Sequence, residues 1–486
     1  MEYSRASTAL ICITLCLLFV PGATIAAPGD APASAPSKRP NIVFLMGDQW
    51  RAQAFGYAGD PNVKTPNIDR LAAESVNFTH AVAGMPVCSP TRASLLTGQR
   101  PIQHGIFVND AHLADDAATF AEVLRDGGYD TAMIGKWHLE GHGREAFIPR
   151  EHRQGFDYWK VLECTHAYNK SIYYADGPEK LQWEGYDAIA QTKDAGQYIK
   201  DHAKVDKPFL LCLWWGPPHN PYSTAPKRFA EMYDADKIQL RPNVSPADAA
   251  TARKELAGYY AHCSALDECV GDLRQTLREA GIDRDTIIVF TSDHGDMIHS
   301  NGFERKQKPW DESVRVPMLW HYPKGLGETG KQVDAPISSE DVMPTLLRLT
   351  GAEVPKTSSG FDYSGYMRGG PNPNPSNAAL ISCLSPFGEF IRKNGGREYR
   401  GIRTPRYTYV RDLNGPWLLY DNETDPYQQH NLVGPPAAAE LQAKLEPILA
   451  EKLKEANDKF EPGDVYLAKW GYKDRVNANG TLPTTP

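Results

Sequence analysis

The stretch Pro40-Asn-Ile-Val-Phe-Leu-Met-Gly-Asp48 decides how this chain folds, because it is an apolar, β-type run that ends in a carboxylate. We expect a strand over residues 42–46. Three similar runs follow along the chain, at residues 131–134, 209–214 and 287–291, and helical patterns separate them. This alternation predicts an α/β fold with a large mixed, mostly parallel sheet flanked by helices.

Four helices are expected around these strands, over residues 66–75, 119–127, 247–280 and 341–349. Thr65 is a suitable capping residue for the first of them, and Pro66 fits its first turn. The larger domain is therefore expected over residues 40–356.

A smaller C-terminal subdomain is expected over residues 378–470. Residues 357–377 are rich in Gly, Pro, Ser and Asn, which is typical of a connector. Beyond the connector, four short strand patterns and one helical pattern follow, at residues 379–383, 398–403, 407–411, 417–420 and 440–456. They predict an antiparallel α+β subdomain in which a helix packs on a sheet.

The first residues have the composition of a secretory signal peptide. Arg5 supplies the positive charge, residues 9–20 are apolar, and residues 23–27 are mostly small. We expect a signal peptide over residues 1–27 and an Ala-, Pro- and Ser-rich linker over residues 28–39. The apolar part is shorter than the ~20 residues of a membrane span. A secreted or periplasmic protein without stable membrane insertion is therefore expected, with an uncleaved anchor as the alternative.

Charge and cysteine content exclude two further classes of protein. The net charge is −8 over 486 residues, which gives no support to nucleic-acid binding. Eight cysteines are present, and removal of the signal peptide would leave six. Cys263 and Cys269 lie on one predicted helix, where six residues rise about 9 Å, too far for a disulfide. A disulfide scaffold is therefore not expected.

Each of the four predicted strands runs into polar side chains, at the end of the sheet where open α/β proteins bind ligands. These side chains are Asp48 and Gln49, Lys136 and His138, His219, and Asp293 and His294. One such residue is often only a turn or a helix cap, but four strand ends are hard to explain in that way. The oxygen-bearing groups, with one imidazole, predict a site for calcium or magnesium, because zinc favours more His or Cys. Lys136, His138, His219 and Lys306 would form a pocket for a tetrahedral anion.

The run Cys88-Ser-Pro-Thr-Arg-Ala-Ser-Leu-Leu-Thr-Gly98 places a cysteine just before a short predicted helix. Pro90 suits the first turn of this helix, and Gly98 suits its end. Free N–H groups at the start of a helix favour an anion, and Arg92 would lie about one turn further on. A buried structural cysteine is the alternative interpretation of Cys88.

This run resembles the Cys-x-Pro-x-Arg signature of the formylglycine-dependent sulfatases, a family of the alkaline-phosphatase-like superfamily. Other stretches resemble the same family: residues 40–48, Thr65-Pro-Asn-Ile-Asp69, Gly135-Lys-Trp-His-Leu139, Ser292-Asp-His-Gly295, Asp311-Glu-Ser-Val-Arg-Val-Pro317 and Leu419-Tyr-Asp-Asn-Glu-Thr-Asp-Pro426. The resemblance covers about residues 40–432. It implies the alkaline-phosphatase-like fold and hydrolysis of sulfate esters.

The resemblance also implies how Cys88 would act. A formylglycine-generating enzyme would oxidise it to formylglycine (3-oxoalanine), and one hydroxyl of the hydrated aldehyde would attack the sulfate sulfur. The second hydroxyl would then lose its proton and expel sulfate. A plain serine or thiol would leave a stable sulfate ester, which gives a chemical reason for the modification.

The same resemblance implies roles for the other candidate residues. One calcium ion would be held by Asp48, Gln49, Cys88, Asp293 and His294. Arg92 would hold the nucleophile, Lys136 would contact sulfate, and His138 would take the proton from the diol. His219 and Lys306 would contact sulfate and protonate or stabilise the leaving oxygen. Lys306 is preferred to Lys308 because it stands five residues before Asp311, the usual spacing in the family.

Two departures from the family pattern leave alternatives open. Gln49 stands where many members carry an acid, and His294 where many carry Asn. These variants resemble subgroups that include phosphonate monoester hydrolases, which also share the start Asp48-Gln-Trp-Arg51. A phosphonate monoester or phosphate diester hydrolase is therefore the alternative activity, whereas the sulfatase-like Gly135–Leu139 stretch speaks against it. An inactive binder of sulfated glycans is the alternative from another class.

The substrate is expected to be a sulfated carbohydrate, because residues 156–186 are dense in aromatic side chains that could pack on sugar rings. These are Phe156, Tyr158, Trp159, Tyr168, Tyr173, Tyr174, Trp183 and Tyr186. Ordinary packing of an insertion is the alternative. His166 and Asn169 could reach sugar hydroxyls, while His80, His104 and His112 lie in loops where nothing separates them from solvated histidines.

Overall fold

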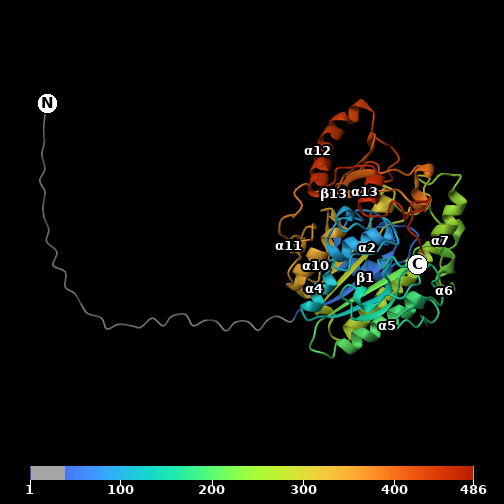
Figure 1. Ribbon diagram of the computed structural model, residues 1–486, viewed down its shortest axis with the longest axis vertical. Coiled ribbons are helices and arrows are strands. Elements are labelled where there is room, and N and C mark those ends of the chain that lie inside the picture. Colours follow the sequence, from blue (N-terminus) through green and yellow to red (C-terminus); the bar gives the residue numbers. More distant parts are fainter. Residues whose placement is uncertain (2–38, 485–486) are drawn as a thin grey trace. The chain divides into compact units, whose positions relative to one another are not determined.

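The computed structural model describes Met1 and residues 39–484 (Figure 1). Apart from Met1 and Arg39, the predicted signal peptide and linker lie outside the described residues. Among the helices that the structure does describe, none is long and apolar enough to cross a membrane. Secretion therefore stays a prediction.

The predicted large sheet is present, with eight strands in the order β11-β2-β10-β9-β1-β8-β4-β5. Neighbouring strands run parallel except at β10, which is antiparallel to both β9 and β2. The bounds are β1 (Asn41–Asp48), β2 (Val76–Phe78), β4 (Asp130–Lys136), β5 (Tyr158–Leu162), β8 (Phe209–Pro218), β9 (Thr286–Ser292), β10 (Met318–His321) and β11 (Lys331–Val333). All four predicted strands lie at its centre, and every residue of β1 is buried.

Helices cover both faces of this sheet (Figure 1). One face packs against α2 (Cys88–Thr97), α4 (Phe120–Asp126) and α10 (Val342–Thr350). The other face packs against α1 (Pro66–Ala73), α5 (Asp187–His202) and the long α7 (Ala249–Glu279). Because side chains alternate along a strand, Ile42, Phe44 and Met46 of β1 enter the first layer, whereas Val43 and Leu45 enter the second.

The ends of these helices follow the expected chemistry with one exception. Gly98 ends α2 in the left-handed conformation, with φ = 65°, which glycine adopts at little cost. Thr65 stands at the start of α1, but its side chain caps no helix N–H. Its hydroxyl donates instead to Asp69 Oδ1 and accepts from the N–H of Gly56, so the predicted side-chain cap is wrong.

The predicted C-terminal sheet is also present, as four antiparallel strands in sequence order. Its strands and helix are β13 (Ala379–Cys383), β14 (Tyr399–Arg403), β15 (Tyr407–Asp412), β16 (Gly415–Asp421) and α12 (Ala439–Glu455). One face packs under α12. The other face shares an apolar cluster with Val82, Trp310 and Val314 of the larger part. The boundaries of the two domains stay a prediction, since the described residues from Arg39 onward form one compact unit.

The remaining strands and α-helices of the described residues are short. They are β3 (Ala81–Val82), β6 (Ile172–Tyr173), β7 (Leu181–Gln182), β12 (Ile337–Ser338), α3 (Pro101–His104), α6 (Lys227–Ala230), α8 (Asp311–Val314), α9 (Pro323–Leu326), α11 (Ser364–Met367) and α13 (Gly463–Lys469). The six cysteines of the described part are buried and unpaired, which agrees with the expectation that Cys263 and Cys269 form no disulfide.

Candidate active site

The polar side chains predicted at the strand ends meet at one edge of the large sheet. Asp48 ends β1 and Lys136 ends β4, while His219 follows β8 and the Asp293–His294 pair follows β9. These four strands are neighbours and parallel, so their carboxyl ends lie side by side. Cys88, the first residue of α2, enters the same space, and the predicted residues therefore form one site.

Cys88 is buried among charged groups rather than among apolar side chains. Its Sγ lies 3.2 Å from His294 Nε2, 3.3 Å from Lys306 Nζ and 3.7 Å from Asp48 Oδ1. Burial opposes ionisation of this thiol, yet the charges of Lys136 and Lys306 outweigh it and hold its pKa well below the ordinary value. Such surroundings are typical of a reactive cysteine and not of a structural one.

Arg92 ties three strand ends together from inside α2. Its Nη2 donates to Asp48 Oδ2 at 3.0 Å, its Nε to Asp293 Oδ2 at 3.1 Å, and its Nη1 to the backbone oxygen of Lys136 at 2.7 Å. The guanidinium group also lies over the ring of Trp214, 5.5 Å from the centroid. With every nitrogen used and the side chain fully buried, Arg92 is held rigidly behind Cys88.

Four of the predicted metal ligands have the geometry of a cation site. Asp48, Cys88, Asp293 and His294 each place one donor atom within 4.8 Å of the others. His294 Nδ1 lies 2.8 Å from the backbone oxygen of Gly295, so its N–H donates there and Nε2 keeps a lone pair toward the cluster. Burial and the charge of Asp48 raise the pKa of Asp293 to about 6. An added positive charge would therefore stabilise the ionised form of Asp293. The donor set fits a divalent cation.

The fifth predicted ligand, Gln49, is oriented by a residue that the sequence did not indicate. Asp296 Oδ2 accepts a hydrogen bond from Gln49 Nε2 at 2.6 Å. Because a carboxylate attracts the NH2 group, the Gln49 oxygen faces the other way, 3.4 Å from Lys306 Nζ. The only sequence signal for Asp296 was its position three residues after Asp293.

Lys306, and not Lys308, reaches the site. Lys306 Nζ lies 2.9 Å from His219 Nε2, in addition to its contact with the Cys88 sulfur. Lys308 Nζ turns away and donates to the backbone oxygen of Glu304 at 2.6 Å. The spacing from Asp311 therefore selected the lysine that the structure brings to the pocket.

His138 is fixed by a pair of residues in the loops that follow α3 and β4. Its Nε2 lies 3.2 Å from Asp110 Oδ1, and both oxygens of Asp110 accept from Arg144 at 2.8 Å. Burial opposes protonation of His138, but the charge of Cys164 and the hydrogen bond to Asp110 raise its pKa to about 10. The imidazole is therefore protonated at neutral pH while Cys88 is unmodified. No sequence signal distinguished Asp110 or Arg144 from other loop residues.

Two site residues also hold the backbone in the left-handed region. Gln49 has φ = 66° and follows Asp48, the last residue of β1, whereas His138 has φ = 65° and lies two residues beyond Lys136, the last residue of β4. Non-glycine residues seldom adopt this conformation, and it persists only where surrounding contacts enforce it. Such strain is typical of functional sites, and here it occurs at two residues whose side chains contact other residues of the site.

The comparison with known families agrees with this geometry. A family model for sulfatases matches residues 40–352, and a model for the C-terminal part of N-sulphoglucosamine sulphohydrolase matches residues 300–456. The chain belongs to the sulfatase family. It is a sulfuric ester hydrolase, and the predicted alkaline-phosphatase-like fold is confirmed.

Individual sulfatases resemble the chain over most of its length. An ulvan-active sulfatase from Formosa agariphila is 47% identical over 440 residues, which cover 89% of this chain and 85% of that protein. An endo-4-O-sulfatase from Bacteroides thetaiotaomicron is 29% identical and covers 82% of this chain and 88% of its own. A solved structure in complex with its substrate D-glucosamine-2-N,6-O-disulfate has a TM-score of 0.75 and 26% identity, covering 88% of this chain and all of the other.

The sulfatase site opens into a cavity of about 440 Å³. Its floor contains Cys88, Lys136, His138, His219 and Lys306. Its outer wall includes Phe387, Gly388, Glu389, Ile391, Lys393 and Asn394, and two residues near the C-terminal end, Asn479 and Thr481. No sequence pattern indicated that the C-terminal part of the chain reaches the site, because these residues lie outside the predicted strands and helix.

The aromatic segment does not line this cavity, so its rings give no support to stacking on a sugar there, and the alternative of ordinary packing fits them better. None of the eight aromatic residues lines it, although His166 from the same segment does. Six of the eight side chains are buried. Tyr168, for example, packs beneath Gly216, and its hydroxyl donates to the backbone oxygen of Asn220. Asn169 instead donates to the backbone oxygen of Thr224, away from the pocket.

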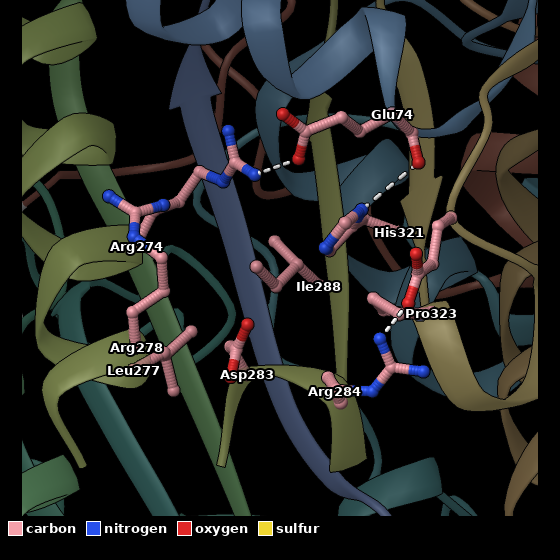
Figure 2. Close-up of a pocket in the computed structure, with 10 residues that line it drawn as sticks. Glu74, Arg274, Leu277, Arg278, Asp283, Arg284, Ile288, His321 and Pro323 are labelled. Atoms are coloured by element: carbon pink, nitrogen blue, oxygen red, sulfur yellow. Dashed lines mark hydrogen bonds and ion pairs between the residues drawn. The ribbon is translucent and has the colours of Figure 1, made fainter. Parts of the chain in front are cut away.

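A second cavity, of about 380 Å³, lies near the amino end of β9 and is unlike the first (Figure 2). Figure 2 shows Arg274 paired with Glu74, and His321 bonded to the backbone oxygen of Glu74. Arg284 is paired with Glu328 in the same way. Because these charges already neutralise one another and no nucleophile is among the lining residues, this cavity is not a candidate for catalysis.

Proposed function

We propose that this sulfatase removes sulfate from a sulfated carbohydrate through a formylglycine formed from Cys88. The proposal rests on one observation, the position of the Cys88 sulfur between Lys306 Nζ and His294 Nε2 on the floor of a cavity. A packing cysteine of the same chain, Cys212, has only burial around it, and burial raises the pKa of its thiol. The two cysteines are equally buried but differ in the charges that surround the sulfur, which set the pKa of the thiol.

Formylglycine would supply a hydrated aldehyde, with one hydroxyl to attack the sulfate sulfur and a second to help expel sulfate afterwards. The chain itself prepares residue 88 for negative charge, because it stands at the start of a ten-residue helix. Arg92 keeps the residue in place through its bonds to two carboxylates and a carbonyl. A formylglycine-generating enzyme is the proposed partner for maturation.

Calcium is the proposed metal ion, and Asp48, Gln49, residue 88, Asp293 and His294 would hold it. It would supply positive charge beside residue 88 and the sulfate oxygens. Two carboxylates and the amide oxygen of Gln49 suit a hard cation. The residues of the chain that surround this place are buried, so the charge acts with little screening by water.

Lys306 is the proposed proton donor to the leaving oxygen. Its Nζ and His219 Nε2 share one proton at 2.9 Å. Burial and the charge of Lys306 lower the pKa of His219 well below its ordinary value. Burial also disfavours the charge on Lys306, but Cys88 and Asp48 raise its pKa. The proton therefore resides on the lysine, where it can be given to the alcohol that departs. Lys136, directed at the same space, would contact the sulfate oxygens.

His138 is proposed to take the proton when sulfate is expelled. In the unmodified chain it is protonated, partly because the Cys88 sulfur accepts its hydrogen bond. Conversion of Cys88 removes this negative charge and shifts His138 toward the neutral form that accepts a proton. Asp110 fixes the ring in the orientation needed, since Arg144 holds Asp110 in turn.

A sulfated polysaccharide such as ulvan is the proposed substrate. The 47%-identical relative is named for activity on ulvan, and the neighbour of known structure binds a disulfated glucosamine. The cavity wall supports this choice, because Asn394, Asn479 and Thr481 offer amide and hydroxyl groups to sugar hydroxyls. Lys393 adds a cation for a second acidic group of the sugar.

Two measurements test the proposal. Digestion and mass spectrometry of the Cys88 peptide should show an aldehyde in active protein, and Cys88→Ala should release no sulfate from ulvan oligosaccharides. An unmodified thiol in active protein from the native host would contradict the mechanism. Activity on an aryl sulfate without activity on any sulfated sugar would contradict the substrate, and faster hydrolysis of an aryl phosphonate monoester would favour the alternative enzyme.

Secretion to the periplasm or the exterior remains part of the proposal. The composition of residues 1–27 supports it, and so does a polysaccharide substrate, which is too large to enter a cell readily. N-terminal sequencing of the mature protein from its host should give a start near residue 28, whereas an intact Met1 would count against cleavage.

A further inference from the structure

Three histidines surround one buried glutamate on the loops beside the catalytic cavity. His142 Nδ1 and His152 Nδ1 lie 3.0 and 2.9 Å from Glu140 Oε1. The ring of His112 lies 5.2 Å from the rings of the other two, measured between centroids. None of these residues takes part in the sulfatase site described above.

The second oxygen of this glutamate has no partner. Glu140 Oε2 is buried and makes no hydrogen bond to the described residues, although only 3% of the side chain is exposed. His112 Nδ1 lies 4.0 Å from this oxygen and 2.9 Å from the backbone oxygen of the same glutamate. A buried carboxylate oxygen without a partner is costly, so the arrangement leaves room for a positively charged ligand.

We propose that His112, Glu140 and His142 bind a divalent transition metal ion of the zinc type, with His152 as the fourth donor. The first three residues can each place a donor atom within 4.8 Å of the others. Imidazoles with one carboxylate suit zinc, whereas calcium prefers oxygen ligands throughout. His112 Nε2 lies 3.0 Å from Asp115 Oδ1, which would orient the ring from behind, as second carboxylates do at zinc sites.

The backbone around Glu140 is preorganised for such a site. The carboxylate of Glu163 accepts hydrogen bonds from three successive N–H groups, those of residues 139–141. Gly141 has φ = 70°, and a Cβ there would lie 2.6 Å from the backbone nitrogen of His112. The two loops therefore approach as closely as backbones can, which brings His112 beside Glu140.

The site would also connect to the catalytic residues without touching substrate. His112 follows Asp110 by two residues, and Glu140 follows His138 by two. The N–H of Leu113 donates to the oxygen of Leu139 at 2.9 Å, and Asp110 bonds to His138 and Arg144, so the two loops are already joined. A metal ion bound by both loops would add a further link, beside the Asp110–His138 hydrogen bond.

Metal content under excess calcium tests the proposal. Tag-free protein is stripped with a chelator, dialysed with excess calcium and a small excess of zinc, and measured by elemental mass spectrometry. The Cys88→Ala background is used, because it removes the soft ligand of the sulfatase site. We expect one zinc per chain and a higher melting temperature with zinc than without it. The combined variant His112→Ala/His142→Ala should retain less than a tenth of that zinc.

His430→Ala is the matched control, because His430 is exposed and pairs only with Asp425 far from the cluster. It should keep the full zinc content. His142→Gln guards against misfolding, since His142 is 60% exposed, and it should lower zinc content while the zinc-free melting temperature stays unchanged. Absence of zinc from the Cys88→Ala protein, or full retention in the double variant, would overturn the proposal.

Discussion

The catalytic cavity and the cavity near the amino end of β9 are similar in size and opposite in chemistry. The cavity at the carboxyl edge of the sheet measures about 440 Å³ and the one at the amino edge about 380 Å³, and both are lined by charged residues. At the amino edge, Arg274 and Arg284 meet glutamates at the rim (Figure 2). At the carboxyl edge, Lys136 and Lys306 converge on a sulfur that is fully buried. We infer that a cavity lined by charged residues is not reactive for that reason alone. Reactivity requires that buried cations be directed at one nucleophile.

The largest expected difference between the cavities is catalytic. Lys306→Ala should lower kcat/KM on an aryl sulfate by about 10²–10³-fold, because it removes a charge that faces the leaving oxygen. Arg274→Ala should change kcat/KM by less than about twofold, since Arg274 faces only Glu74. Steady-state kinetics of both variants measure this contrast. Equal losses in the two variants would show that the cavities are coupled.

The second largest difference is expected when the proposed calcium ion is removed, because only the cavity at the carboxyl edge should depend on it. Dialysis against a calcium chelator should lower turnover by at least about tenfold, because residue 88 and the sulfate oxygens would lose the positive charge that the proposed ion supplies. Calcium should restore turnover in the wild type but not in Asp293→Asn. The same treatment of Glu74→Gln should leave the response to calcium as in the wild type. Full activity of chelated protein with no detectable metal would contradict the proposed metal site.

Burial should also decide what an arginine–carboxylate pair contributes to stability. Arg403 Nε and Nη2 donate to the two oxygens of Asp311 at 2.9 and 3.0 Å, where the two sheets meet. Burial opposes ionisation of Asp311, but Arg403 and Arg315 lower its pKa from 3.8 to about 2. This shift corresponds to about 2 kcal/mol, which we expect Asp311→Asn to remove in urea unfolding at pH 7.

The sign of the pH dependence follows from the direction of that shift. Because the pKa of Asp311 is lower in the folded chain, the stabilisation is present above about pH 4 and is lost as pH falls through about 2. The difference in unfolding free energy between wild type and Asp311→Asn should therefore shrink over this window. A difference that stays constant with pH would mean that packing, and not charge, accounts for it.

The smallest effect is expected at the rim of the amino-edge cavity. Glu74 pairs with Arg274 there, and its side chain is 38% exposed. Exposed pairs contribute little, so Glu74→Gln should change the free energy of unfolding by less than about 1 kcal/mol. Urea unfolding in low and high salt measures this. If Glu74→Gln lost as much unfolding free energy as Asp311→Asn, the proposed distinction between exposed and buried arginine–carboxylate pairs would be wrong.

Much of the architecture and of the pocket floor could be predicted from the sequence. The long apolar runs fixed the central strands within one or two residues, except at β8, which continues to Pro218. The polar groups after them fell into one site because parallel strands end at one edge. Asp110 and Asp296 could not be predicted, since each acts by orienting another side chain and lies in a loop with no periodic pattern.

The aromatic segment, residues 156–186, shows why composition alone could not predict a sugar-binding surface. A dense run of Tyr and Trp is compatible with a sugar-binding face and with core packing, and nothing local distinguishes them. In the fold, Trp183 stacks on Tyr173, and Phe156 packs edge-on against Trp137, so most of these rings are used inside the protein. Only tertiary structure determines which face of such a segment meets solvent.

The wall of the catalytic cavity has a consequence for how such enzymes diversify. The reacting groups stand on the ends of rigid strands, whereas wall residues within 387–394, with Asn479 and Thr481, reach the opening from short 3-10 turns and loops after the connector. Insertions or exchanges in those segments would reshape the entrance without disturbing a single reacting atom. Preference for one sugar over another can therefore drift quickly in a lineage while the chemistry stays fixed, and a laboratory library aimed at new glycans should begin at the wall and spare the floor.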